Sequence, residues 1–287
     1  MILVTGATGF VGRSLMRALQ QQELPVRTYK GLMNDGMRLR EALEGVQIVY
    51  HLASAESSGS RRRLQHVDID GTERLVREGQ RADVQRIIMM SRLNANPNSI
   101  YPLLRAKGEA ERLVRQSTIP HTIVRSATLF GIDDRFLNVI ASLAAWTWPF
   151  VWLPNGGEVV MQPLWVEDLV ECLMLLLERP DLCDETVTVA GEERMRYRQL
   201  VQLVLEAAGF SRMPLKVDVR LLRPLRAMTM GWWRRPPVTS FFLHRFSVPD
   251  VAPADSVLHT FDFRPERLVD HLSYLRRGGW RRRLFSL

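Results

Sequence analysis

Three glycines at the start of the chain are the residues whose spacing most directly indicates chemistry. Gly6, Gly9 and Gly12 follow the apolar run 1–5 and open an amphipathic stretch, residues 10–22. Glycine lets the backbone turn tightly and approach a pyrophosphate, and the free N–H groups of the first helical turn can bind the phosphate oxygens. Because the glycines lie between a buried strand and a helix, they predict a dinucleotide-binding site and disfavour a glycine-rich turn without a ligand.

Basic side chains near the second expected strand, residues 25–30, bear on which dinucleotide is bound. The end of this strand faces the adenosine ribose in dinucleotide folds, where an acidic residue favours NAD. The strand carries Arg27 and Lys30 but no acid, and Arg13 lies nearby on the first expected helix. We therefore expect NADP(H), with its anionic 2′-phosphate, in preference to NAD(H).

Strands and helices alternate through the first half of the chain. Buried strands are expected at residues 1–5, 25–30, 47–53, 85–91 and 121–125, separated by helices at 10–22, 37–43, 61–81 and 101–116. This order predicts an α/β protein with a Rossmann-like, doubly wound parallel sheet. The connection over residues 31–44 is short, so either a strand–helix unit is missing or the second strand is the only one on its side. Ser91 ends the fourth strand at the carboxyl edge, where ligands bind.

Three regions follow from these patterns. Residues 1–155 are expected to form the dinucleotide-binding domain, with contributions from 156–190. Residues 156–210 are expected to form a small α/β lobe, in which a helix at 166–177, a strand at 186–190 and a helix at 197–208 close over the sheet edge. Residues 211–287 form a basic, aromatic C-terminal extension with a docking role.

The composition narrows the class of protein. The chain has 287 residues, of which 46% are hydrophobic, so a sizeable core can form. It begins directly with a strand and shows no signal-peptide pattern. Cys172 and Cys183 have neither a disulfide framework nor a metal spacing, and the six histidines are scattered, so we expect a cytoplasmic protein without a metal site.

Positive charge is concentrated in the C-terminal extension, which holds 15 Lys and Arg against 6 Asp and Glu. Between residues 220 and 246 arginines alternate with Leu, Met, Trp and Phe, and residues 276–285 repeat this pattern. Such a segment is typical of a lipid headgroup layer, where aromatic rings lie at the boundary and guanidinium groups meet phosphate. We expect an anionic membrane surface or a membrane complex as the partner. A helical pair packed on the lobe is the main alternative, and a nucleic-acid arm is disfavoured because no nucleic-acid module is visible.

An uncharged stretch of eighteen residues, 136–153, precedes the lobe. Its length is marginal for a membrane span, and Asn138, Trp146, Trp148 and Pro149 argue against one. We expect a helix that lines the substrate cleft and exposes tryptophans at an interface. A fully buried core helix is the alternative.

Several longer motifs carry a family resemblance. They are TGATGFVG (5–12), YHLA (50–53), VDIDGT (67–72), SRLNAN (91–96), RAKGEAE (105–111), FGIDDRFLN (130–138) and MQPLWVEDLV (161–170). Over roughly residues 1–210, and more loosely to the end, the chain resembles the atypical, extended short-chain dehydrogenase/reductases, which are similar to NAD-dependent epimerases and dehydratases. More narrowly, it resembles the NAD(P)H-binding accessory subunit of respiratory complex I and its bacterial relatives.

The glycine spacing, the basic residues near the second strand and the resemblance together give the residues expected to hold the cofactor. They are Thr5, Gly6, Thr8, Gly9, Phe10, Val11, Gly12, Arg13, Arg27, Lys30, Leu52, Ala53, Lys107 and Arg125. Two departures from the family pattern bear on how the cofactor is oriented. The acidic residue that contacts adenine in the family is absent near Leu32, and the family's Arg-Pro after the fifth strand is Arg125-Ser126 here.

The resemblance also implies a catalytic serine and lysine, at Ser91 and Lys107. Active members place a tyrosine four residues before the lysine, as the proton donor or acceptor beside the nicotinamide. Here that position is Leu103. The nearest phenol, Tyr101, lies six residues before Lys107, and residues six apart on a helix do not share a face. Tyr101 can act only if Pro102 keeps it outside the helix and a loop brings it in.

Two functions fit these features. The first is an NAD(P)H-binding subunit or assembly partner of a membrane, quinone-linked complex, weakly catalytic or non-catalytic and peripheral on the inner face of the membrane. The second is an active NAD(P)H-dependent reductase, epimerase or dehydratase that acts on a lipophilic substrate, such as a quinone or an isoprenoid. The substrate and the oligomeric state have no signal in the sequence.

Overall fold

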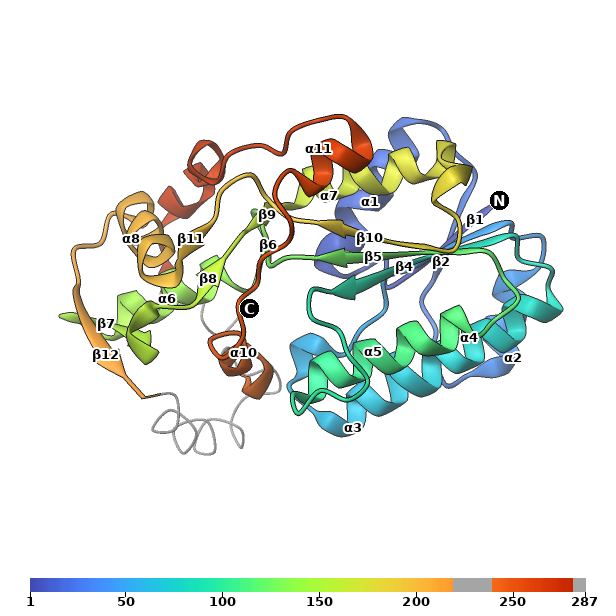
Figure 1. Ribbon diagram of the computed structural model, residues 1–287, viewed down its shortest axis with the longest axis horizontal. Helices are drawn as coiled ribbons and strands as arrows, with labels where there is room; N and C mark the ends of the chain where they lie inside the picture. Colours follow the sequence, from blue (N-terminus) through green and yellow to red (C-terminus); the bar gives the residue numbers. More distant parts are fainter. Residues whose placement is uncertain (219–238, 281–287) are drawn as a thin grey trace.

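A parallel sheet of six strands forms the centre of the protein (Figure 1). The computed structural model describes residues 1–218 and 239–280. The strand order is β10-β5-β4-β3-β1-β2. The strands are β1 (Ile2–Thr5), β2 (Val26–Tyr29), β3 (Ile48–His51), β4 (Arg86–Arg92), β5 (His121–Ser126) and β10 (Glu185–Val189). The predicted doubly wound parallel sheet is confirmed.

The two edges of this sheet settle one open alternative and correct one prediction. β2 is the edge strand beyond β1, and α2 (Gly36–Leu43) returns from it directly to β3 on the other side of β1, so the second strand is the only one there. At the other edge, β10 pairs in parallel with β5. Residues 186–190 therefore contribute to the sheet domain, as expected for part of 156–190, and their expected place in the lobe is wrong. The preceding helix α7 (Val166–Leu175) packs on the sheet domain, so the chain continues the βαβ alternation for one more unit.

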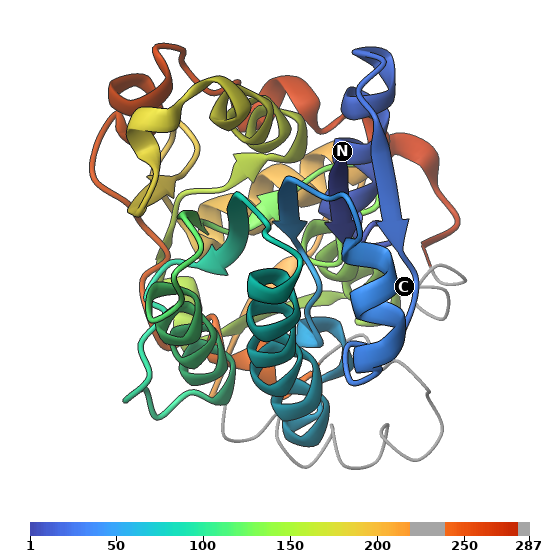
Figure 2. The same ribbon diagram turned by 90° about the vertical axis from the view of Figure 1, so that its right-hand side faces the viewer.

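Helices cover both faces of the sheet (Figures 1 and 2). One face carries α1 (Phe10–Gln21), α7 and α11 (Ser256–Phe261), and the other carries α2, α4 (Asp70–Arg81) and α5 (Pro102–Arg115). A short helix, α3 (Arg61–Leu64), and a π-helical turn, Gln65–Ile69, lead into α4. Successive strand residues point to opposite faces. Val4 accordingly packs in the cluster of Leu15 on α1, and Leu3 in the cluster of Leu39 and Leu75.

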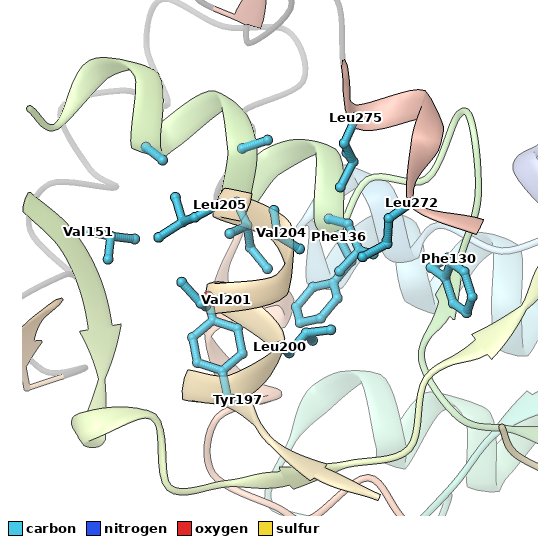
Figure 3. Packing of buried hydrophobic residues seen from close by; sticks show 14 of the residues in the cluster. Phe130, Phe136, Val151, Tyr197, Leu200, Val201, Val204, Leu205, Leu272 and Leu275 are labelled. Atoms are coloured by element: carbon cyan, nitrogen blue, oxygen red, sulfur yellow. The ribbon is translucent and has the colours of Figure 1, made fainter. Parts of the chain in front are cut away.

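The lobe lies beside the carboxyl edge of the sheet. It is built on α6 (Leu137–Trp146) and α8 (Tyr197–Ala208). Three strand pairs complete it: β7 (Phe150–Pro154) with β12 (Met213–Val217), β8 (Val160–Met161) with β11 (Met195–Arg196), and β6 (Leu129–Phe130) with β9 (Leu164–Trp165). Figure 3 shows its core, where Leu200 and Val204 of α8 pack with Phe136, Leu272 and Leu275.

The uncharged stretch 136–153 divides into two elements. Its helix, α6, has only ten residues and is mostly buried in the lobe core, as the buried-helix alternative predicts. Trp146 and Trp148 are nevertheless exposed, as the interface interpretation predicts. Throughout residues 1–218 and 239–280, no helix is long and apolar enough to cross a membrane.

The C-terminal extension returns to the sheet domain. The short helix α10 (Ser240–His244) lies between the sheet and the lobe (Figure 1). Phe241, Phe246 and Trp280 are buried, so their expected position in a lipid headgroup layer is wrong. Residues 219–238 and 281–287, with Trp232, Trp233 and the final arginines, lie outside the described residues.

Asp168 in the first turn of α7 gives the fold a testable pH dependence. Its side chain is buried, and burial raises its pKa to about 7. A carboxyl whose pKa is raised by folding stabilises the protein below its unfolded pKa and loses this contribution as the pH rises through the folded pKa. We expect Asp168→Asn, which can still accept from the Glu266 N–H, to be more stable than the wild type at about pH 8.

Urea unfolding at about pH 5 and pH 8 measures this effect. The wild type should lose stability between the two conditions, and Asp168→Asn should lose clearly less. Glu185→Gln, which removes an exposed carboxylate on β10, is the matched control and should keep the wild-type dependence. Equal pH dependence in the wild type and Asp168→Asn would contradict the assignment.

Candidate dinucleotide-binding site

The glycine-rich turn brings the start of α1 against the ends of β1 and β3. Gly6 has a φ of +72°, a conformation that favours glycine, and a Cβ there would lie 2.7 Å from the backbone of Leu52 and Ala53. A Cβ on Gly12 would lie only 2.3 Å from the carbonyl oxygen of Gly6. The turn can therefore be this tight only with glycine at both positions.

The N-terminus of α1 is left open for an anion. Gly9 is its N-cap residue and provides no side-chain cap, and the first turn contains no acidic residue. The N–H of Gly9 donates to Gly6 O at 2.9 Å, but the amides of Phe10 and Val11 have no acceptor within the helix. The free amides and the positive end of the helix dipole together favour the binding of a pyrophosphate at this end of α1.

A buried polar chain fixes the strand end beneath this turn. The Thr5 hydroxyl lies 2.8 Å from Nδ1 of His51, whose Nε2 lies 2.9 Å from the hydroxyl of Thr72. The Thr72 hydroxyl donates to the carbonyl of Asp68, so it accepts from His51 Nε2–H. Burial, with the nearby charge of Lys107, lowers the pKa of His51 to about 3, so the ring is neutral and has a structural role.

A cavity of about 280 Å³ opens in front of the glycines. Six of the predicted cofactor residues line it: Gly6, Gly9, Phe10, Val11, Gly12 and Leu52. The remaining lining comes from residues without a predicted role: Ser54, Glu56, Ser57, Arg92, Leu129, Asp134, Arg135, Phe136, Thr239, Phe241, Phe242 and Arg245. The last four come from the C-terminal extension, so a segment late in the chain forms one wall of the cavity.

The predicted catalytic serine has a buried acidic partner away from the cavity lining. The Ser91 hydroxyl donates to Oε1 of Glu111 at 2.5 Å. Arg125, predicted to contact the cofactor, also binds Glu111, through Nη2 to Oε2 at 2.6 Å. Glu111 is fully buried, so this cluster ties β4 and β5 to α5.

Lys107 is likewise held by a buried carboxylate. Its Nζ lies 2.9 Å from Oδ1 of Asp68, and both side chains are almost inaccessible. Asp68 also accepts from the Ser54 hydroxyl at 2.7 Å and the Ala55 N–H at 2.8 Å. Lys107 thus fixes the loop after β3, which borders the cavity.

Leu103, which occupies the position of the family's tyrosine, lies in an apolar environment. Leu103 is buried in a small cluster with Ala55, Leu64, Ala106 and Phe241. Phe241, in α10, is also almost completely buried. The C-terminal extension therefore fills the space next to Leu103 with an aromatic ring.

Tyr101 is not brought to the main cavity. It is the N-cap residue of α5, and its ring lies 5.2 Å from that of His244, centroid to centroid. It lines a second cavity of about 40 Å³ that Phe241 and Arg245 also border. These two side chains line both cavities, whereas Tyr101 lines only the second.

Three charged side chains of the lining form an ion cluster with Asp250 beside them. Glu56 and Arg245 form an ion pair with Oε1 and Nη2 at 2.5 Å, and Arg92 lies 3.7 Å from Oδ2 of Asp250. Asp250 also accepts from the N–H of Thr128 at 2.7 Å and from its hydroxyl. Burial raises the pKa of Glu56, but the charges of Arg92 and Arg245 outweigh this and hold it at about 2. The cluster thus joins the C-terminal extension to the sheet edge.

Asp134, in the FGIDDRFLN motif, has a structural role at the mouth of the cavity. It is buried and accepts the N–H groups of Phe136 and Leu137 at 2.7 and 2.5 Å, which caps the start of α6. It also accepts from the Tyr274 hydroxyl at 2.7 Å. Burial raises the pKa of Asp134, partly offset by these hydrogen bonds.

The three basic residues expected at the 2′-phosphate lie in different places. Arg27 donates to the carbonyls of Ala42 and Glu44 at 2.8 and 3.0 Å, at the end of α2 and hence at the amino edge of the sheet. Its predicted cofactor contact is therefore not supported. Lys30 is exposed beyond the carboxyl end of β2, and Arg13 binds Thr8 O and Asp133. The preference for NADP(H) rests on these two residues and stays a prediction.

The missed lining residues had little local signal. Glu56 and Arg245 are 189 positions apart, and neither belongs to a motif that predicts their pairing. Asp134 and Arg135 lie within the FGIDDRFLN motif, which by itself predicts no role for either side chain. Phe241 and Arg245 belong to the run of alternating basic and aromatic residues, a pattern that indicates a lipid surface.

Gly12→Ala tests the steric basis of the turn. The added Cβ, 2.3 Å from Gly6 O, must displace backbone, so we expect a destabilisation of about 3 kcal/mol and loss of dinucleotide binding. Gly36→Ala is the control, because its Cβ would meet nothing nearer than 3.5 Å. Thermal unfolding and nucleotide titration measure both variants. Wild-type binding by Gly12→Ala would contradict the assignment of the cradle.

Glu56→Gln tests the ion cluster. Loss of this charge from two nearly buried guanidinium groups should cost about 2 kcal/mol at neutral pH. Because the pKa of Glu56 is lowered, the wild type keeps its contribution above the usual carboxyl pKa of 4.5 and loses it as the pH falls toward about 2. The destabilisation should therefore shrink at about pH 3.5.

Urea unfolding at the two pH values gives the comparison. Glu109→Gln is the control, because its surface pair with Arg112 should contribute about 0.5 kcal/mol or less. If Glu56→Gln were as stable as the wild type at neutral pH, the ion cluster would not stabilise the packing of the C-terminal extension on the sheet edge.

Comparisons with known proteins agree with this geometry. Residues 6–136 match the family model described as NAD(P)H-binding. The chain is 25% identical over 254 residues to the 40 kDa subunit of mitochondrial NADH-ubiquinone oxidoreductase from Neurospora crassa, covering 80% of this chain and 66% of that subunit, slightly less than two thirds of its length. It is 35% identical over 171 residues to sterol demethylase protein B of Methylococcus capsulatus, covering 50% and 52% of the two chains.

A solved structure shows the same fold. MoeE5 in complex with UDP-glucuronic acid and NAD superposes with a TM-score of 0.76 at 19% identity, over 100% of this chain and 99% of that chain. The fold, the glycine cradle and the sequence matches agree. Residues 6–136 of this chain therefore form a domain of the family described as NAD(P)H-binding.

Proposed function

We propose that the protein holds NADP(H) as a bound ligand that it turns over slowly or not at all, and that it serves as a subunit or assembly partner of a membrane complex. The observation that carries this proposal is the burial of Leu103 in one apolar cluster with Phe241. Reduction with a nicotinamide also requires a proton donor beside the substrate. At the family's position for that donor, this chain has a buried apolar side chain in an apolar cluster.

The other expected catalytic groups support the same proposal. Ser91 and Lys107 are engaged with the buried carboxylates of Glu111 and Asp68, and neither lines the cavity. Among the described residues, the cavity lining includes no tyrosine, lysine, histidine or cysteine. Its buried carboxyl, Asp134, is occupied by backbone amides and Tyr274. The groups that remain can bind and orient a dinucleotide.

The cradle itself fits the ligand. Gly6 and Gly12 leave room where a Cβ would collide with backbone, and the first-turn amides of α1 point to the cavity edge. Arg92, Arg135 and Arg245 place three guanidinium groups in the lining. Asp250 and Glu56 pair with two of them, so the fit to a polyanionic ligand rests on the glycines and the amides of α1.

The membrane complex is proposed from relatives and composition. The similarity to a subunit of NADH-ubiquinone oxidoreductase supports assembly with a quinone-linked complex, peripheral on the inner face of the membrane. The basic, aromatic composition of residues 211–287 supports the same location. An active reductase on a lipophilic substrate has less support, because Tyr101 faces His244 and not the main cavity.

Nucleotide content is the deciding measurement. The protein is purified gently and denatured, and the released NADP(H) and NAD(H) are quantified by chromatography. We expect about one NADP(H) per chain, because the cradle is intact and the cavity is walled by the C-terminal extension. The intact protein is then assayed for NADPH oxidation with a short-chain quinone, and we expect little or none.

Leu103→Tyr sharpens the test, because it restores a phenol four residues before Lys107. We expect no gain in turnover, since this position is buried in an apolar cluster that includes Phe241. Rapid oxidation by the wild type would overturn the non-catalytic assignment. A protein that is empty and does not bind added NADPH would overturn the nucleotide-binding role.

A further inference from the structure

The far end of the lobe presents a concentrated apolar surface, which we call the lobe tip: Trp146, Trp148, Phe150, Met213 and Leu215. These residues are between 38% and 73% exposed. Eleven large apolar side chains are exposed in the described part of the chain, and five of them gather here, including both exposed tryptophans and the exposed phenylalanine. Single exposed apolar residues are ordinary, whereas such a concentration marks an interaction site.

The lobe tip is held in place by backbone hydrogen bonds. β7 and β12 pair in parallel, so that Met213 lies opposite Phe150 and Leu215 opposite Trp152. The N–H of Phe150 donates to Thr147 O at 2.7 Å, and the Thr147 hydroxyl donates to Phe150 O at 2.6 Å. This tight turn carries Trp148. Figure 1 shows β7 and β12 at the end of the lobe remote from the central sheet, where a flat partner can reach them.

The charged side chains within the lobe tip are basic. Residues 143–157 and 207–217 contain Arg212 and Lys216 but no acidic residue, while Glu158, Glu206 and Asp218 flank these ranges and Glu158 is paired with Arg196 and Arg198. The guanidinium of Arg212 donates to Ala144 O at 2.8 Å and lies over the ring of Phe210, while Lys216 is exposed on β12. After β12 comes Asp218, and the sequence of residues 219–238 then adds five arginines and two tryptophans and no acid. The net positive charge of this part of the chain is complementary to an anionic partner.

The combination of residue types selects a lipid surface. Tryptophan is enriched where an apolar and an aqueous phase meet, and lysine or arginine next to it can bind lipid phosphate. A nucleic acid would leave the apolar side chains of Met213 and Leu215 without an apolar partner. We propose that the lobe tip inserts into the interfacial layer of an anionic bilayer, with Lys216 and Arg212 at the level of the phosphates. This inference rests on the membrane association proposed above and names the surface that makes it.

Vesicle binding by the full chain tests the proposal. Large vesicles of phosphatidylcholine, with or without phosphatidylglycerol, are sedimented with the protein, and acyl-brominated lipid reports tryptophan insertion by fluorescence quenching. We expect the wild type to bind the anionic vesicles and to bind the neutral ones at least tenfold more weakly, because each cation near an anionic surface contributes about a fivefold factor.

The variants separate the lobe tip from the rest of the chain. Trp148→Ser combined with Met213→Ser should weaken binding to anionic vesicles about tenfold or more and reduce the quenching. Lys216→Glu should lower the preference for anionic lipid. The matched control combines Ile100→Ser with Met37→Ser, which are 83% and 75% exposed elsewhere, and it should bind like the wild type. Thermal unfolding confirms that all variants are folded.

Each contrary result has a distinct meaning. Undiminished binding by Trp148→Ser with Met213→Ser would overturn the lobe tip as the contact surface while leaving membrane association intact. Absence of binding by the wild type would overturn both, whereas the nucleotide content would still test the cofactor role separately. A dimer of the wild type that the same double substitution abolishes would assign the surface to a second copy of the chain.

Discussion

At the glycine-rich turn, the backbone of Gly6 lies against the backbone of Leu52 and Ala53, and the backbone of Gly12 lies against that of Gly6. These close approaches leave no room for a side chain at Gly6 or Gly12. The approach aims the first turn of α1 at the cavity. It also fixes the position of Leu52, and of the loop that follows β3, relative to the cavity. The buried chain from Thr5 through His51 to Thr72 then couples this edge to α4. The phosphate-binding half of the site depends on this one steric constraint.

The other half of the site is organised by two buried carboxylates. Glu111 holds Ser91 and Arg125, and Asp68 holds Lys107 together with the loop at Ser54. A buried carboxylate is tolerated only when its charge and lone pairs are satisfied, and these side chains satisfy them. The residues that match the family's catalytic positions therefore contribute to the rigidity of α5 and the cavity wall. Sequence identity at such a position does not by itself indicate chemistry.

Local patterns explain what could be predicted from the sequence. The apolar runs and the glycine spacing are short-range signals, so the parallel sheet and the cradle could be predicted. The lobe core follows from the helical periodicity of residues 197–208. Contacts distant in sequence carry no such signal, and the pairing of Glu56 with Arg245 could not be anticipated.

The predicted places of Arg27 and of residues 186–190 were wrong for the same reason, because both depend on contacts between segments distant in sequence. Arg27 was placed by its position on β2, but its guanidinium caps carbonyls at the end of α2 instead. Strand β10 (Glu185–Val189) alternates polar and apolar residues, as strands in many settings do. Only tertiary packing determines that it joins the central sheet. Residue type and order restrict the partners of a side chain, but the final choice is made in three dimensions.

The wall formed by Phe241 and Arg245 also has a consequence for biosynthesis. Every other element around the cavity comes from the first 136 residues, which leave the ribosome long before this wall does. A nascent chain can therefore complete the glycine turn while the cleft is still open on the side of Leu103. A chain that stops before residue 239 keeps the fingerprint motif but exposes Leu64 and Leu103. The lining of the cavity is thus complete only after residues 239–245 have been synthesised.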